Sequence, residues 1–219
     1  DSAIALLNTL KESMKAESEA TRMYYRLLCI KANDKAYIRH TSDSLILPVL
    51  HYYTEKKDEH HLPEAYYYAG RVYRDLEDAP LALDYFQKAI DALPDNKGYR
   101  LKSKIYSQMG TLFLYQKTYD EALKILKEAR KCNIALKDSA SMVFNLRDIA
   151  NGYRCLDQND SSLYYLRKAY YIAKVLRNYD LMAMVQSQMA SLYIELEKYD
   201  LARKFLQPSL DSLDIPSRS

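Results

Sequence analysis

The sequence predicts an all-α protein, an α-α superhelix of about five helical hairpins, with one additional helix at the N-terminal end. Three observations lead to this prediction. Residues 64–94 have the pattern of one helical hairpin. The pattern returns three more times at a constant interval of about 40 residues, within the range of periods typical of repeat proteins. The 219 residues include only 4 Gly and 6 Pro, so the chain offers few of the tight turns that a many-stranded β fold needs.

The hairpin pattern of residues 64–94 consists of two apolar faces separated by a break. In the first half, apolar and small residues recur at the three-and-four spacing of one helix face, at Tyr66, Ala69, Gly70 and Tyr73. Asp78 and Pro80 then signal a new helix start, because proline lacks an N–H that the first turn would leave unpaired. The second face follows, and Pro94 ends it; its members are Ala82, Tyr85, Phe86, Ala89 and Ile90.

Five columns of this pattern keep one register over four copies. The small residue Gly70 returns as Gly110, Ala150 and Ala190. The other columns are Tyr73, Phe113, Tyr153 and Tyr193; Ala82, Ala122, Ser162 and Ala202; Phe86, Leu126, Leu166 and Leu206; and Ala89, Ala129, Ala169 and Ser209. This order of large, small and aromatic residues resembles the tetratricopeptide repeat (TPR). The usual TPR period is about 34 residues, so we expect the longer period here to lengthen the helices around a short break, in 131–144 and 173–184.

The repeats divide the chain into hairpins at about residues 15–57, 60–93, 97–132, 138–175 and 178–213, preceded by an orphan helix at 2–11. We expect one solenoid domain over residues 1–219. In the first hairpin, Tyr25, Leu28, Cys29 and Ala32 fit a first helix; Ser42, Ile46 and Val49 fit a second helix after one inserted residue. No polar capping helix follows the last hairpin, although solenoid ends normally need one. We therefore expect the chain to be a fragment of a longer protein; the alternative is that the last helix is its own cap.

Composition indicates an ordinary globular chain, with 48% hydrophobic and 28% charged residues. A net charge of +3 gives no sign of a nucleic-acid or anionic-membrane surface, and no apolar run is long enough to cross a membrane. Cys29, Cys132 and Cys155 are far apart, so we expect free thiols packed as small hydrophobic residues.

The sequence contains no pattern that points to catalysis, a cofactor or a metal. It lacks a glycine-rich phosphate loop, a GxSxG elbow and an HExxH motif. His51 and Glu55 have helical i, i+4 spacing, but two ligands alone are a weak signal, and we expect His40, His51, His60 and His61 to be solvated. We therefore expect a binding protein and not an enzyme.

The resemblance to TPR arrays implies that the first helix of each hairpin lines a concave ligand-binding groove. The columns that would face it include Tyr67, Arg71, Arg74, Lys104, Ser107, Thr111, Phe144, Arg147, Asn151, Arg154, Ser187 and Ser191, with Arg26, Ile30 and Asn33 at the entry. The recurring arginines predict a protein or peptide partner of acidic character, because a guanidinium group matches a carboxylate. The alternative is that these arginines pair with Glu64, Asp75 and neighbouring helices. We also expect that replacing Arg71 and Arg147 together weakens binding without changing the melting temperature.

Three short segments are similar to one subgroup, the exported TPR regulators of Gram-negative anaerobic bacteria: DSAIALLNTL, TSDSL and AYYYAGRVYRDLED. That resemblance implies the extracytoplasmic sensing or interaction portion of a membrane-tethered regulator. Two alternatives stay open, a free cytoplasmic adaptor of the same fold and a peptide-responsive regulator whose DNA-binding part is absent from the chain.

Overall fold

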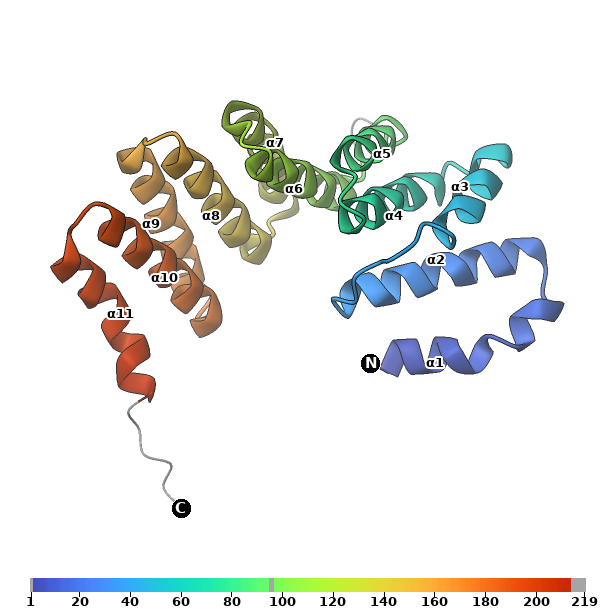
Figure 1. The fold of residues 1–219 in the computed structure, drawn as a ribbon, viewed down its shortest axis with the longest axis horizontal. Coiled ribbons are helices and arrows are strands. Elements are labelled where there is room, and N and C mark those ends of the chain that lie inside the picture. The colour runs from blue at the N-terminus through green and yellow to red at the C-terminus, as the bar shows by residue number, and fades with distance from the viewer. Residues whose placement is uncertain (1, 95–96, 214–219) are drawn as a thin grey trace, which may run out of the picture. The chain divides into compact units, whose positions relative to one another are not determined.

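The computed structural model describes residues 2–94 and 97–213, without the side chains of 208–213. Within these ranges the protein is all-α, with eleven α-helices, one 3-10 helix and no strand (Figure 1), which confirms the predicted fold class. The chain begins with α1 (Ser2–Leu10) and the 3-10 helix η1 (Ser13–Ala16). Five helix pairs follow: α2 (Glu19–Lys35) with α3 (Ile46–Glu55), α4 (Leu62–Asp75) with α5 (Ala79–Asp91), α6 (Tyr99–Tyr115) with α7 (Tyr119–Leu136), α8 (Ser139–Cys155) with α9 (Asn159–Val175), and α10 (Tyr179–Glu195) with α11 (Tyr199–Leu213).

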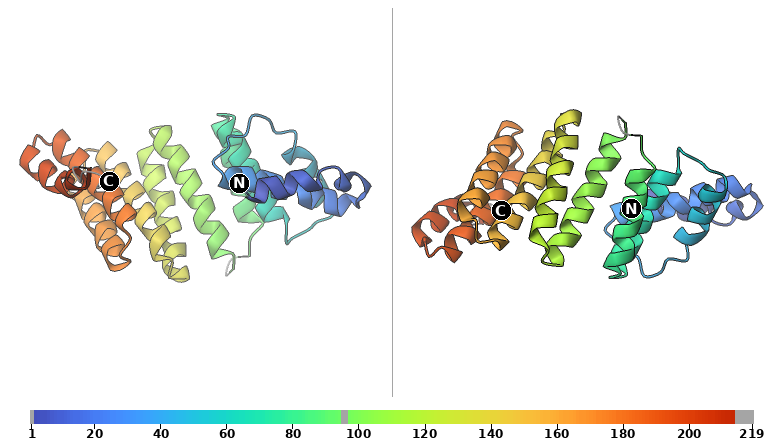
Figure 2. Two further views of the ribbon diagram at one scale, coloured as in Figure 1. Left: turned by 90° about the horizontal axis from the view of Figure 1, so that it is seen from below. Right: turned by 90° about the horizontal axis from the view of Figure 1, so that it is seen from above.

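The chain divides into two compact units, residues 1–105 and residues 106–219, and each is described by itself. In both units the second helix of one pair packs on the first helix of the next, as α3 does on α4 and α7 on α8. First helices also contact each other, α2 with α4 and α8 with α10. Figure 2 shows these successive antiparallel helices from two further sides. That the two units form one solenoid domain stays a prediction.

Small residues at the predicted columns bring paired helices into direct contact. A Cβ atom built on Gly70 would lie 2.5 Å from the Phe86 ring, and one on Gly110 would lie 2.5 Å from the Leu126 side chain. Distances below about 3 Å cannot be accommodated without movement, so a larger side chain at either glycine would overpack the contact. Ala122, on the facing helix, is fully buried.

The helices end in a repeated left-handed turn, which accounts for the long period. Residues with φ between +49° and +65° recur at a constant spacing on each side of the gap at 95–96: Tyr37, Lys57 and Glu77, then Lys117, Lys137, Asp157, Arg177 and Glu197. After each one, the next N–H bonds back to a carbonyl five residues earlier, as Asp138 N does to Asn133 O at 3.0 Å. This is the Schellman arrangement. In the later repeats, each helix together with the turn that follows it therefore takes up half of the repeat. Two such halves make the long period.

The same turn corrects the register of the first hairpin. Tyr37 lies one full period before Glu77, so the repeat continues upstream without an inserted residue. Ile30 is therefore the counterpart of Gly70; it is 1% exposed and belongs to the core instead of the groove entry. Ser42 precedes α3 instead of opening it. The predicted face misled because Tyr25 and Cys29 turn toward α1, where the Tyr25 hydroxyl donates to Leu7 O at 2.9 Å.

Two expectations about single side chains are also corrected. Cys132 is buried and Cys29 partly buried, but Cys155 is exposed and does not pack as a small hydrophobic residue. Within the described residues, none of the three cysteines forms a disulfide. His40 is buried and not solvated. Among the helices of the described residues, none is both long and apolar enough to cross a membrane.

Candidate protein-binding surface

In residues 1–105, the first helices present a charged face whose members bind one another. Arg71 of α4 forms an ion pair with Asp34 of α2, and the two side chains are only 15% and 10% exposed. The Arg71 guanidinium also donates to the Tyr67 hydroxyl at 3.2 Å. Tyr67 itself is 4% exposed, so its ring packs in the core and offers little surface to a ligand. Two of the predicted groove residues are thus internal.

Arg74 is also held by a carboxylate of its own chain. Its guanidinium lies 2.6 Å from Asp75 Oδ1, and the His40 backbone N–H donates to the same carboxylate at 3.1 Å. Burial of Asp75 works against ionisation, but these hydrogen bonds outweigh it and the pKa of Asp75 is lowered. Arg74 therefore pairs with Asp75, as the alternative interpretation of the arginines expected. Arg71 differs in its partner, since Glu64 pairs with Lys31 at 2.6 Å.

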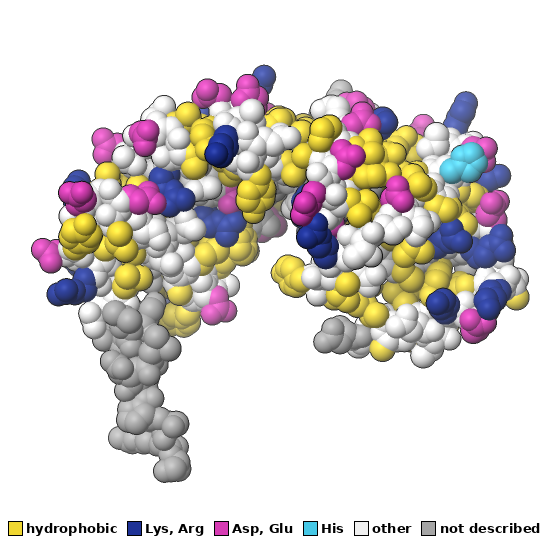
Figure 3. All heavy atoms as spheres, viewed as in Figure 1, with side chains coloured by type: hydrophobic (Ala, Val, Ile, Leu, Met, Phe, Trp, Pro, Cys, Tyr) yellow, Lys and Arg dark blue, Asp and Glu magenta, His cyan; other side chains and the backbone are white. Residues whose placement is uncertain are grey.

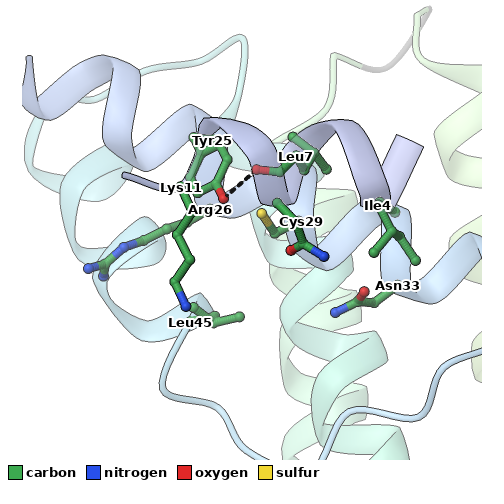
Figure 4. Close-up of a pocket in the computed structure, with 10 residues that line it drawn as sticks. Ile4, Leu7, Lys11, Tyr25, Arg26, Cys29, Asn33 and Leu45 are labelled. Atoms are coloured by element: carbon green, nitrogen blue, oxygen red, sulfur yellow. Dashed lines mark hydrogen bonds between the residues drawn. The ribbon is translucent and has the colours of Figure 1, made fainter. Parts of the chain in front are cut away.

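Asp34 and Lys31 are inner-face residues that the predicted register did not reveal. The correct register places them in the columns of Arg74 and Arg71, one repeat earlier. Extending the repeat period upstream without an insertion would have found them. Arg26 and Asn33, which were predicted at the entry, instead line a cavity of about 240 Å³ under α1 (Figure 4).

Lys104 is the remaining predicted residue of this unit. Its pKa is lowered, first by partial removal from water and then by the positive charges of Lys35 and Lys31. Lys104 is exposed and forms no ion pair with a carboxylate of the described residues.

In residues 106–219, the first helices of three consecutive pairs enclose a cavity of about 320 Å³. Four of the predicted groove residues line it, namely Thr111 of α6 and Arg147, Asn151 and Arg154 of α8. The other lining residues are Leu114, Tyr115, Asp148 and Gln188. Part of the groove predicted from the TPR pattern is therefore brought together in this cavity.

The arginines of this cavity also have partners within the chain. Arg147 forms an ion pair with Asp148 at 2.7 Å and lies 5.4 Å from the centre of the Phe144 ring. Burial raises the pKa of Asp148, and the nearby Arg147 charge opposes that shift. Arg154 donates to Asn151 Oδ1 at 2.9 Å and meets Glu195 at 3.1 Å. The site is consequently mixed in charge, and the predicted basic groove is largely neutralised.

The remaining predicted residues of this unit lie outside the cavity lining. Ser107 supplies the carbonyl that accepts a hydrogen bond from Thr111 Oγ1 at 2.9 Å. Ser191 Oγ donates to Ser187 O at 3.0 Å, and both serines are exposed. Phe144 is 43% exposed. In the space-filling view, hydrophobic side chains and both signs of charge are interspersed over the visible face of each unit (Figure 3).

The histidines make local contacts. His51 Nε2 lies 3.4 Å from Glu55, and His61 Nδ1 lies 2.9 Å from Asp58 while its ring stacks on Tyr53. Burial lowers the pKa of His40, against the attraction of Asp75 and Asp34. In the part of the chain that the structure describes, no three His, Cys, Asp or Glu side chains are grouped so that they could hold a metal ion.

Comparison with known proteins shows the fold and no closer relationship. No protein-family model matches the chain. No curated protein is similar to it in sequence. Solved structures do match, among them a signal transduction ATPase with a tetratricopeptide repeat sensor from Pyrococcus horikoshii, with a TM-score of 0.78, 18% identity, and coverage of 94% of this chain and 33% of that one. The chain thus spans about one third of that protein.

Two further structures illustrate how varied proteins of this fold are. BtubC from P. vanneervenii has a TM-score of 0.75 and 14% identity, covering 99% of this chain and 94% of that one. Aspartyl phosphate phosphatase F from Bacillus subtilis has a TM-score of 0.75 and 17% identity, covering 95% and 56%. The chain described here therefore has the TPR solenoid fold. Since a phosphatase shares it, the fold alone does not decide between a binding protein and an enzyme.

Proposed function

We propose that this chain is a protein-binding scaffold, and that the cavity formed by α6, α8 and α10 binds an extended segment of a partner protein. The observation that carries the proposal is the convergence of Thr111, Arg147, Asn151 and Arg154 from successive first helices on one concave site. The Pyrococcus protein supports it, since the tetratricopeptide repeats of that protein form a sensor.

The lining residues suit a peptide backbone with an acidic side chain. Asn151 and Gln188 carry amide groups that both donate and accept hydrogen bonds, as a peptide backbone requires. Tyr115 is 80% exposed and offers a rigid apolar surface. Of the two arginines that line the cavity, Arg154 is the more available to a partner carboxylate, because its own partner Glu195 is 54% exposed and such surface pairs contribute little.

The test uses a displayed library of random peptides selected on the full chain, and then a comparison of variants. Asn151→Ala with Arg154→Ala should weaken the selected peptides at least tenfold and leave the melting temperature nearly unchanged. Ser187→Ala with Ser191→Ala, on exposed positions outside the cavity, serves as the control. Selected peptides that bind the Asn151 and Arg154 variant with parental affinity would place peptide binding elsewhere.

We further propose that the scaffold is the sensing or interaction portion of a membrane-tethered regulator. Support comes from the resemblance of DSAIALLNTL, TSDSL and AYYYAGRVYRDLED to exported TPR regulators. Cell fractionation with an antibody against this chain tests the idea, and the protein should sediment with membranes. Recovery in the soluble cytoplasmic fraction would favour the free adaptor, and recovery on DNA would favour the peptide-responsive regulator.

A further inference from the structure

A second, larger cavity lies elsewhere in residues 106–219 and has only α8 in common with the first. It measures about 540 Å³ and is formed by α7, α8 and α9, which follow one another in Figure 1. Its described lining consists of the aliphatic and thioether side chains Ile134, Met142, Leu146 and Ile172, the rings Tyr164 and Tyr171, and the cations Arg130, Arg167 and Lys168. It shares no lining residue with the cavity of α6, α8 and α10.

Large apolar side chains are exposed around this cavity. Tyr171 is 68% exposed, Ile134 55% and Tyr164 52%. Single exposed apolar residues are common, but a group of them around a concave apolar floor is typical of an interaction site. The cavity therefore offers a partner both a place for a side chain and an apolar rim.

The charges of this cavity differ from those of the predicted groove. Arg71, Arg74, Arg147 and Arg154 all have a carboxylate partner within the chain. Arg130, Arg167 and Lys168, by contrast, form no ion pair with any carboxylate that the structure describes. Lys168 Nζ lies instead over an aromatic ring, 4.4 Å from the centre of Tyr164.

The surrounding sequence reinforces this positive field. Between Ser161 and Tyr179 there is no Asp or Glu, while four cations occur, at Arg167, Lys168, Lys174 and Arg177. That stretch therefore supplies no carboxylate that could neutralise the cations at the rim of the cavity. A cluster of one sign of charge beside a low-dielectric surface attracts a ligand of the opposite sign.

We propose that this cavity docks an acidic segment of a partner protein, with one aliphatic or aromatic side chain of that segment inserted between Ile134, Met142 and Tyr171. The apolar lining favours a segment that carries an apolar side chain over a purely charged one. The three cations favour carboxylates next to that side chain. This is a binding surface additional to the proposed peptide site in the cavity of α6, α8 and α10. The N-terminal half of α8 lines the surface proposed here, and its C-terminal half lines the other cavity.

The experiment selects a library of random twelve-residue peptides on the full chain and removes those that also bind the Arg167→Glu, Lys168→Glu variant. The peptides that remain should be net acidic and should each contain a large apolar residue. Their affinity should fall at least tenfold in that variant and should decrease with added salt. Tyr171→Ser should weaken them without changing the salt dependence, because it removes apolar contact only.

Two matched controls separate this site from others. Arg203→Glu with Lys204→Glu makes the same charge change at exposed positions of α11, and it should leave the affinity unchanged. Asn151→Ala with Arg154→Ala, which tests the proposed peptide groove, should also have no effect on these peptides. All four variants alter side chains that are not fully buried, and thermal melts establish that each one is folded.

Several outcomes would overturn the proposal. The first is that no selected peptide depends on Arg167 and Lys168. The second is that the peptides that remain after selection are not acidic. The third is an equal loss of affinity in the α11 control, which would indicate unspecific attraction. Binding to phosphatidylserine vesicles that depends on the same two residues, with no dependent peptide, would assign the surface to lipid. A dimer of the parent chain that Tyr171→Ser dissociates would assign it to a second copy.

Discussion

Lys137 follows the last residue of α7 and has φ of +53° and ψ of +31°, in the left-handed region that glycine adopts most readily. In the part of the chain that the structure describes, seven other helix ends carry a residue other than glycine in the same region, including Glu77, Asp157 and Arg177. A side chain costs roughly 1 kcal/mol in this conformation. The Schellman hydrogen bonds at each turn offset that cost by satisfying carbonyls at the helix end.

The first prediction follows from this cost. Lys137→Gly should raise the free energy of unfolding by up to about 1 kcal/mol, because relief of the left-handed strain exceeds the added freedom of the unfolded chain. Urea denaturation measures the change. Lys137→Ala is the control and should have little effect, since alanine keeps the Cβ atom. A glycine variant less stable than the alanine variant would contradict the assigned strain.

The second prediction concerns Arg71 and replaces the expectation that this residue can be changed without loss of stability. Arg71→Ala leaves Asp34 almost buried without its partner, so the free energy of unfolding should fall by roughly 3 kcal/mol. Adding Asp34→Asn should recover a large part of the loss, because it removes the uncompensated charge. An Arg71→Ala variant that melts at the parental temperature would show that the pair does not form in solution.

At the scale of the element, α1 is the most weakly packed helix of the first unit. None of its described residues is buried, and only Ile4 and Leu7 of its large side chains turn toward the cavity that it forms with α2 (Figure 4). The Cys29 thiol lies in that cavity, and burial raises its pKa. Access to this thiol therefore reports on the docking of α1.

The third prediction uses this thiol in a chain with Cys155→Ser, which removes the exposed cysteine. Leu7→Ser should raise the rate of Cys29 labelling by a disulfide reagent at least fivefold, since it removes an apolar contact that holds α1. Leu6→Ser is the matched control, because Leu6 is adjacent and 62% exposed, and it should leave the rate unchanged. Equal rates in all three chains would mean that α1 does not limit access to Cys29.

At the scale of the whole molecule, stability in a solenoid is approximately a sum of terms between neighbours. Among the described elements, α8 packs against α7, α9 and α10, whereas α11 packs mainly against α10. The side chain of Leu206 is only partly buried, and that of Leu210 lies outside the described residues. The number of neighbours therefore ranks the helices of the second unit by expected stability.

The fourth prediction is that backbone amides of Tyr199–Leu213 exchange with solvent at least tenfold faster than those of Ser139–Cys155. Hydrogen exchange followed by mass spectrometry measures both helices in one sample of the full chain. Equal protection of α11 and α8 would contradict the nearest-neighbour account and would mean that α11 is held by contacts of another kind.

Local patterns in the sequence were enough to predict the all-α fold, the helix pairs and the repeat period. Helix faces depend on residues three or four positions apart, so the pattern around Gly70 and Phe86 could be recognised locally and then followed through its copies. It also identified four of the side chains that line the cavity of α6, α8 and α10. The register failed only at α2, where contact with α1 gives Tyr25 and Cys29 an apolar surrounding of their own.

Which charges are neutralised could be seen only after the helices had been packed against one another. Asp34 and Arg71 lie on different helices, and no local pattern indicates that they meet. The same holds for the burial of His40 beside Asp75. Cations that look alike in sequence therefore differ in their partners. Arg147 is paired within the chain, whereas Arg167 and Lys168 line the cavity of α7, α8 and α9. Electrostatic pairing depends on distances between side chains of different helices, and these distances are set by packing alone.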